Sequence, residues 1–229
     1  MTRVRHTLMV TDIFGATDGI KSLRRQLSLQ GNMVSIIEPY KGKNIPKAQE
    51  ADTYRYFLNE CGHEQYLAHV NHALTSALKL ADQDIYIIGF SAGASAVWRA
   101  LDSNHPLFNI DQHSHAIKHF MGFYPTQIRH HLALSSICKS SIIFPKSEDH
   151  FNVKDIIRHL SSNYHTRCIQ TPFNHGFMNP TSKHYQHNAC VDFENALLKS
   201  NTQTTNASDW QFLEDAKRLS IHYSSDTSA

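Results

Sequence analysis

The 229-residue sequence predicts an α/β protein with a mostly parallel central sheet and helices on both of its faces. Short apolar runs alternate along the chain with longer segments of helical periodicity. The apolar runs are hydrophobic at successive positions, as in strands that are buried on both faces. Since the length suits one large domain, we expect a single sheet.

The expected elements follow in chain order. We predict strands at 8–14, 33–38, 84–90, 119–124, 140–144 and 166–170. We predict helices at 18–30, 63–81, 92–101, 153–160 and 182–198. A polar stretch at 201–208 precedes one more amphipathic helix at 209–222, which we expect to pack against the body or a partner. The prediction is therefore a domain over 1–200, followed by a polar linker, C-terminal helix and tail over 201–229.

Composition excludes several classes of protein. With 22 Lys and Arg against 20 Asp and Glu, the chain lacks the positive excess of a nucleic-acid-binding protein. No apolar run reaches the roughly 18 residues of a membrane helix, and the first residues lack the apolar core of a signal peptide. The four cysteines are widely spaced and form no C-x-x-C pair. We therefore expect a cytoplasmic protein with no nucleic-acid or membrane partner.

Seventeen histidines invite a metal-binding interpretation. His115 and His119 are four residues apart, and His113 and Asp111 lie nearby, a spacing that can hold a metal if the segment is helical. No cysteine or further carboxylate completes the set, and the segment precedes an expected strand. We favour a polar loop and predict no metal and no cofactor, leaving a catalytically silent metal-binding module as an alternative.

Residues 89–93 (GFSAG) match the pattern G-x-S-x-G. The pattern follows an apolar run and precedes an alanine-rich helical segment, which is the strand–turn–helix setting of a serine nucleophile. Flanking glycines are needed there because the chain folds back too tightly for a Cβ atom. Ser91 is therefore the candidate nucleophile.

A serine nucleophile needs a histidine base that a carboxylate orients, and in this setting the chain order is serine, acid, histidine. His175 follows the expected strand 166–170 and is the candidate base. Glu148 and Asp149 both follow the strand 140–144, and adjacent positions leave the choice of acid open. The oxyanion donors are expected to be the N–H of Ala92 and one at the end of the first strand.

Five segments together resemble the dienelactone hydrolase family of the α/β-hydrolases. The resemblance spans about 8–198 and rests on 12–15 (DIFG), 38–40 (EPY), 89–93 (GFSAG), 148–151 (EDHF) and 175–180 (HGFMNP) followed by Tyr185. It implies a three-layer α/β-hydrolase sandwich that is shortened at its N-terminus, because the first motif is reached at residue 12. It also implies a carboxylesterase-like or lactonase-like hydrolase.

The resemblance implies specific roles for residues. Ser91 is the nucleophile, Asp149 the acid, with Glu148 as the fallback, and His175 the base. In the same comparison Ile13 and Ala92 are the oxyanion donors, and the substrate pocket is lined by Asp12, Phe14, Tyr40 and Tyr124.

Three positions depart from the family pattern. Ser91 replaces the prototype's cysteine, Asp12 is one methylene shorter than the family's glutamate, and Asn179 stands where an arginine would bind a substrate carboxylate. We predict a serine hydrolase, monomeric or homodimeric, that cleaves a small ester, lactone or thioester through an acyl-enzyme. A peptidase or acyltransferase using the same residues is the alternative.

Overall fold

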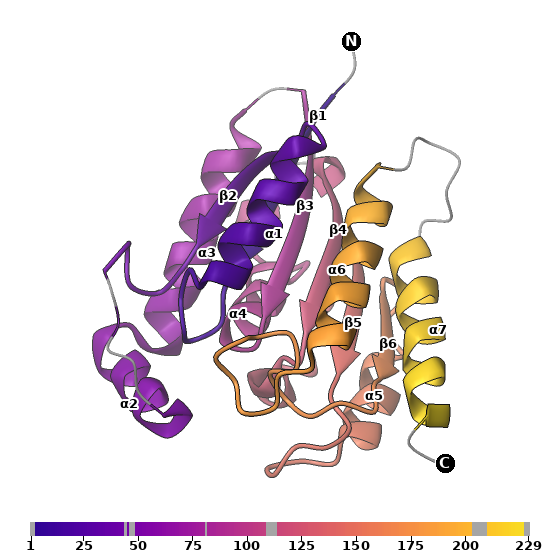
Figure 1. Ribbon diagram of the computed structural model, residues 1–229. Helices are drawn as coiled ribbons and strands as arrows, with labels where there is room; N and C mark the ends of the chain where they lie inside the picture. The colour runs from indigo at the N-terminus through magenta and orange to yellow at the C-terminus, as the bar shows by residue number, and fades with distance from the viewer. Residues whose placement is uncertain are drawn as a thin grey trace.

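The computed structural model describes residues 3–43, 45, 49–80, 82–108, 114–202 and 210–226. Its centre is a six-stranded sheet of order β2-β1-β3-β4-β5-β6 in which every strand pairing is parallel (Figure 1). The prediction of a mostly parallel α/β sheet is confirmed. The strands are β1 (Val4–Val10), β2 (Met33–Ile37), β3 (Gln83–Phe90), β4 (Ile117–Phe123), β5 (Lys139–Phe144) and β6 (Thr166–Gln170).

Helices cover both faces of the sheet and make the outer two layers (Figure 1). One face carries α1 (Asp18–Leu29), α6 (His187–Thr202) and α7 (Gln211–Asp226). The other carries α2 (Glu50–Glu60), α3 (Gly62–Leu78), α4 (Ala92–Ala100) and α5 (Val153–Leu160). Short 3₁₀ turns occupy Pro106–Phe108, Ser114–Ala116 and Thr126–His130.

Alternate residues of the central strands supply two separate hydrophobic cores. In β1, Leu8 and Val10 pack in one core with Val97 of α4, whereas Met9 packs in the other with Phe193 of α6. Burying such a side chain fully contributes about 1.5–3 kcal/mol. The near-continuous apolar runs in the sequence reflect this burial on both faces.

The first strand differs from its prediction at 8–14. β1 begins at Val4, and the apolar residues Ile13 and Phe14 lie in the turn after it. A search for apolar runs misses the start of this strand, because His6 is polar although it is buried. Its ring nitrogens lie 2.8 Å from Gln83 Oε1 and 2.9 Å from Ser35 Oγ.

Two helices also differ. The structure contains α2, which lies in a region without a readable motif, and α6 begins at His187 instead of residue 182. Residues 179–185 form hydrogen-bonded turns, including Ser182 N–H to Asn179 O and Tyr185 N–H to Ser182 O. These turns replace the first turn of the expected helix.

The last helix, α7, packs against α6 and β6. Phe212 and Leu213 are buried in the core on that face, and Tyr223 donates a hydrogen bond of 2.7 Å to Asp192 of α6. Of the polar stretch expected at 201–208, the first two residues continue α6, while residues 203–209 lie outside the described residues.

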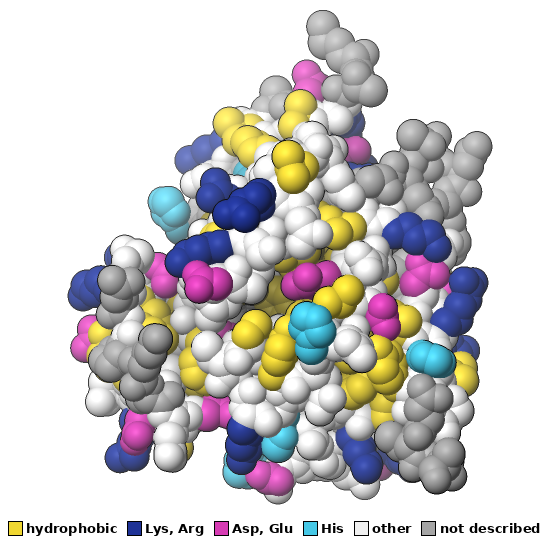
Figure 2. Space-filling model, in the orientation of Figure 1, with side chains coloured by type: hydrophobic (Ala, Val, Ile, Leu, Met, Phe, Trp, Pro, Cys, Tyr) yellow, Lys and Arg dark blue, Asp and Glu magenta, His cyan; other side chains and the backbone are white. Residues whose placement is uncertain are grey.

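The surface carries charges of both signs. On the face drawn in Figure 2, Lys and Arg side chains are interspersed with Asp and Glu. This face therefore has no large patch of a single charge. Within the described ranges, no helix is both long and apolar enough to cross a bilayer.

The order of the strands determines where a site can form. After β1 the chain moves outward to β2, then returns to the other side of β1 as β3, so the connections reverse direction between β1 and β3. In open parallel sheets, ligands bind in the crevice beyond the carboxyl ends of the strands at such a reversal. A site is therefore expected among the residues just after β1 and β3.

Candidate active site

Ser91 lies on a strained turn between β3 and α4. Its φ of 49° and ψ of −113° are outside the regions that L-residues favour. A Cβ at Gly89 would lie 2.8 Å from Ala94 Cα, and one at Gly93 would overlap the Thr11 carbonyl oxygen. Both flanking positions therefore require glycine, and the turn holds the Ser91 hydroxyl beyond the end of the sheet.

Ser91, His175 and Glu148 form a hydrogen-bonded chain. Ser91 Oγ lies 2.9 Å from His175 Nε2, and His175 Nδ1 lies 2.7 Å from Glu148 Oε1. Thr126 Oγ1 donates to the same carboxylate oxygen at 3.3 Å. Because a carboxylate only accepts, Nδ1 carries the ring proton, and Nε2 is left to accept the hydroxyl proton of Ser91.

The acid that contacts the histidine is Glu148, and the expectation for Asp149 is corrected. Glu148 occupies a bridged position opposite Phe151, and its side chain is 9% exposed. Asp149 follows in the turn between them and is exposed. Asp149 is exposed in that turn, and the carboxylate that reaches His175 Nδ1 belongs to Glu148.

The loop that carries His175 is held by its own backbone. Gly176 has a φ of 81°, and the Asn179 N–H donates to Gly176 O at 2.9 Å. Tyr124 packs against the imidazole with ring centroids 4.8 Å apart, in a buried position at the end of β4. Tyr124 also borders a small cavity beside Ser91.

Hydrogen bonds orient the two peptide groups of the turn after β1. The Asp12 carbonyl accepts from Gly15 N–H at 3.2 Å and from Thr11 Oγ1 at 3.0 Å. The Ile13 carbonyl accepts from Tyr40 Oη at 2.6 Å. In a trans peptide the C=O and N–H point in opposite directions, so fixing the Asp12 carbonyl also fixes the direction of the Ile13 N–H.

Two backbone donors are available beside the nucleophile. Within the described part of the chain, the Ile13 N–H donates to no protein acceptor. Ala92 is the first residue of α4, where N–H groups have no acceptor within the helix and the helix dipole is positive. Ile13, Ser91 and Ala92 line the same cleft. This arrangement can bind a negatively charged oxygen.

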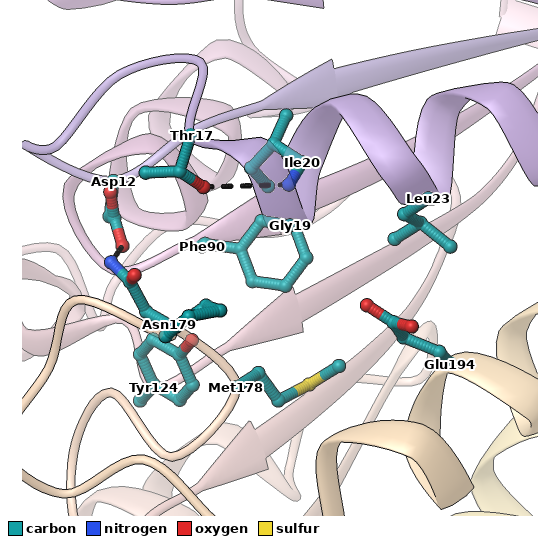
Figure 3. A pocket seen from close by; sticks show the side chains of 11 residues that line it. Asp12, Thr17, Gly19, Ile20, Leu23, Phe90, Tyr124, Met178, Asn179 and Glu194 are labelled. Atoms are coloured by element: carbon teal, nitrogen blue, oxygen red, sulfur yellow. Dashed lines mark hydrogen bonds between the residues drawn. The ribbon is translucent and has the colours of Figure 1, made fainter. Parts of the chain in front are cut away.

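Asp12 is buried beside this turn and makes two hydrogen bonds. Its Oδ1 accepts from Phe14 N–H at 2.9 Å, and its Oδ2 accepts from Asn179 Nδ2 at 2.5 Å (Figure 3). Burial raises the pKa of Asp12 from 3.8 to about 6, and the two hydrogen bonds partly offset this effect. Within the described residues, no hydrogen bond joins Asp12 to Ser91.

The remaining pocket residues divide into two groups. Phe14 lines a small cavity of about 20 Å³ together with Asp12, Ser91 and Tyr124. Tyr40 is buried, and its hydroxyl holds the Ile13 carbonyl. The expectation that Tyr40 lines the pocket is therefore replaced by a contact behind the turn.

A wider cleft of about 520 Å³ opens from Ser91 and His175. The sequence did not reveal most of its polar lining, although Thr126 follows β4 and the ends of parallel strands meet at one edge. Arg129 donates to the Thr126 carbonyl at 2.7 Å. The polar residues missed are Glu50, Tyr54, His63, Ser95, Thr126, Gln127, Arg129, His150, Lys183 and His184.

The histidines considered for a metal do not converge. His113 and Asp111 lie outside the described residues, and His115 is exposed. His119 is buried in β4, where Nε2 lies 2.8 Å from Ser141 Oγ. Among the residues that the structure describes, no three potential ligands lie together.

The chain has a sequence relative whose activity is unknown. No family model matches the chain. An uncharacterized Bacillus subtilis protein, YczH, is 25% identical over 186 residues, which cover 78% of this chain and 83% of the relative. The name of that relative states no activity.

Solved structures show the fold. A Klebsiella pneumoniae protein predicted to be a dienelactone hydrolase superposes with a TM-score of 0.63, 16% identity and 88% coverage of both chains. A dienelactone hydrolase-like promiscuous phosphotriesterase from metagenomic libraries gives 0.58 and 12%, covering 88% of this chain and 87% of its own. Est1E from Butyrivibrio proteoclasticus, with ferulic acid bound, gives 0.55 and 12% over 88% of both chains. The chain has the α/β-hydrolase fold, and dienelactone hydrolase-like proteins are among its structural neighbours.

Proposed function

We propose that the protein is a serine hydrolase that cleaves a small ester, lactone or thioester through an acyl-enzyme. The observation that carries the proposal is the hydrogen-bonded chain from Ser91 through His175 to Glu148 at a strained turn. A serine hydroxyl is a weak nucleophile unless an oriented base accepts its proton. The esterase and dienelactone hydrolase-like structural neighbours support the same reaction class.

In the proposed acylation, Ser91 Oγ attacks the acyl carbon while His175 Nε2 takes the hydroxyl proton. Glu148 stabilises the imidazolium that forms. The carbonyl oxygen becomes an oxyanion, which the N–H groups of Ile13 and Ala92 bind. The bond to the leaving group then breaks as His175 returns the proton to the departing oxygen or sulfur.

Deacylation repeats these steps with water. His175 accepts a proton from water, whose oxygen attacks the acyl carbon, and the same two N–H groups bind the second oxyanion. Collapse of this intermediate breaks the bond to Ser91 Oγ, and His175 returns the proton to the serine. The products are a carboxylic acid and the regenerated enzyme.

The two spaces at Ser91 differ in size, which bears on the substrate. The cavity bounded by Asp12 and Tyr124 has about 20 Å³, room for about one water-sized group, and the polar cleft has about 520 Å³. A leaving group must depart toward solvent, so we assign it to the cleft and the acyl substituent to the cavity. The preferred substrate is then a short acyl ester or thioester with a polar leaving group.

The same acyl-enzyme could be resolved by an amine or alcohol, which keeps a peptidase or acyltransferase as the second candidate. Hydrolysis is favoured because the cleft is open and polar, with Arg129, Lys183 and His184 on its walls, and gives water access to Ser91. A panel in which hydroxylamine and short alcohols compete with water separates these outcomes.

The test of the proposal is covalent labelling by a fluorophosphonate, combined with turnover of p-nitrophenyl acetate. We expect stoichiometric labelling and hydrolysis by the wild-type protein, and loss of both in Ser91→Ala. Ser147→Ala, which alters an exposed serine near the acid, is the matched control and retains both. Equal turnover by wild type and Ser91→Ala on every accepted ester contradicts the proposal.

A further inference from the structure

We infer that Asp12 is a positioning residue that joins the oxyanion turn, residues 12–15, to the base loop, residues 175–182, through Asn179. In this role Asp12 neither attacks substrate nor takes a proton from Ser91. It fixes the Ile13 N–H relative to Ser91 and His175. The inference rests on the proposed hydrolase function and adds a residue to its machinery.

The first argument is the reach of the Asp12 carboxylate. One oxygen holds the turn from within, accepting from Phe14 N–H at 2.9 Å. The other crosses to the base loop and accepts from Asn179 Nδ2 at 2.5 Å. These residues are 167 positions apart in the chain, so the bond connects the segment after the first strand with the segment after the last.

The second argument is that the orientation of the Asn179 amide is determined. Asn179 Oδ1 accepts from Thr181 N–H at 2.8 Å and from Thr181 Oγ1 at 2.6 Å. A backbone N–H can only donate, so the oxygen must face Thr181 and the NH₂ group must face Asp12. The base loop therefore presents a donor that only an acceptor at position 12 can satisfy.

The third argument is burial. Asp12 is 7% exposed and Asn179 is 6% exposed, which shields their hydrogen bond from competing water. Both neighbours of the carboxylate donate, so its ionised form, which only accepts, satisfies them together. A buried donor that loses its acceptor has no water to replace it, so separating the two loops is costly and the bond holds them in register.

The site is sensitive to the relative position of the oxyanion turn and the base loop. Ile13 N–H is one of two proposed oxyanion donors, and its direction depends on the peptide that Asp12 itself contributes. Donors must lie about 2.7–3.1 Å from the oxyanion to act, so a shift of the turn weakens stabilisation of the transition state more than binding of the substrate. This predicts an effect on kcat with little effect on KM.

The experiment uses Asp12→Asn, Asn179→Asp and the double exchange Asp12→Asn/Asn179→Asp. Asp12→Asn sets one NH₂ group against another, and Asn179→Asp sets one carboxylate against another. The exchange restores every hydrogen bond. The amide placed at position 12 would accept from Phe14 N–H and donate to the carboxylate placed at position 179, which would also accept from Thr181. Aspartate and asparagine have nearly the same volume, so packing is retained.

We measure kcat, KM, thermal unfolding and the affinity for methyl trifluoromethyl ketone, a transition-state analogue of acetyl transfer. We expect Asp12→Asn to lower kcat by about 10-fold to 100-fold and weaken the analogue equally, at nearly unchanged KM, less than the full loss of an oxyanion donor. The exchange is expected to recover kcat to within a few-fold. A merely structural pair would change the unfolding temperature without separating kcat from KM.

Two results overturn the inference: a kcat of Asp12→Asn within twofold of wild type, or an exchange variant that folds but remains as inactive as Asp12→Asn. The second result would indicate that the charge at position 12 itself is needed. If Asp12→Asn does not fold, the exchange variant is compared with wild type: a kcat within a few-fold supports the inference, and a folded exchange variant with kcat lowered 10-fold or more overturns it. Failure of the proposed function is distinct, because wild type would then show neither fluorophosphonate labelling nor ester turnover.

Discussion

Glu148 Oε1 lies 2.7 Å from His175 Nδ1, while the neighbouring Asp149 lies exposed in the adjacent turn. Glu148→Gln keeps the side-chain size but allows the amide to present a donor to the imidazole and favours the wrong tautomer. We expect kcat to fall by about 10²–10⁴, by analogy with the loss of the acid in serine triads. Asp149→Asn is the matched control and is expected to change kcat less than threefold. The opposite ranking of the two variants would assign the acid to Asp149.

Tyr40 holds the Ile13 carbonyl, so Tyr40→Phe removes one hydroxyl from a buried hydrogen bond. The carbonyl left unpaired is expected to lower the free energy of unfolding by about 1–3 kcal/mol. It is also expected to lower kcat more than it raises KM, because the oxyanion turn loses an anchor. Urea unfolding and steady-state kinetics measure the two effects. Tyr164→Phe, at a 90% exposed position, is expected to change neither.

Asp12 makes the stability of the fold depend on pH. Burial raises its pKa from 3.8 to about 6, hydrogen bonds from Phe14 and Asn179 and the charge of His175 lower it, and Glu50 raises it further. The folded chain therefore binds this proton more tightly than the unfolded chain. The stabilisation is fully present below about pH 4 and is lost as the pH rises through 6, a change of about 3 kcal/mol.

The measurement for this prediction is the free energy of unfolding of wild type and Asp12→Asn at intervals from pH 4 to pH 7. The asparagine does not titrate, so the difference between the two proteins isolates Asp12. The wild type is expected to lose stability relative to the variant as the pH rises. A difference that stays constant, or changes in the other direction, contradicts a raised pKa at Asp12.

The small cavity beside Ser91 predicts selectivity for short acyl groups. Each added methylene that finds no apolar space loses the roughly 1–3 kcal/mol that a fitted pocket would supply. We expect kcat/KM to fall at least about 10-fold from p-nitrophenyl acetate to the octanoate. Because the leaving group is the same throughout the series, the trend reports on the acyl side alone. A rise in kcat/KM with chain length would show that the acyl chain occupies the larger cleft.

Sequence patterns predicted the elements best where burial is continuous. Strand β3 and helix α4 were predicted within about one residue, because a run of apolar residues and a run of small residues meet at Gly89–Gly93. The start of β1 was missed because Arg5, His6 and Thr7 are polar. The His6 ring is buried against Gln83 and Ser35, partners 77 and 29 positions away. That information is tertiary and is absent from a local window.

The candidate site shows the same division. Ser91 and His175 could be chosen from motif and chain order, whereas Glu148 could not be separated from Asp149. The choice depends on the direction in which each side chain leaves a bridged turn, and both residues are acidic. Likewise Asn179 could be described only as a departure from the arginine of related proteins. Its contact with Asp12 depends on the meeting of two loops that are 167 positions apart in the sequence.

The parallel pairing of β1 with β3 also bears on folding kinetics. It places Val4 beside Gln83, so a long intervening chain must be organised before this pairing can form. Contacts of such large sequence separation form slowly because loop closure costs entropy before contacts repay it. Ile13 and Ser91 follow those two strands. During refolding, ester hydrolysis is therefore expected to recover later than the helical circular dichroism signal. The rate at which hydrolysis recovers then reports the rate at which β1 pairs with β3.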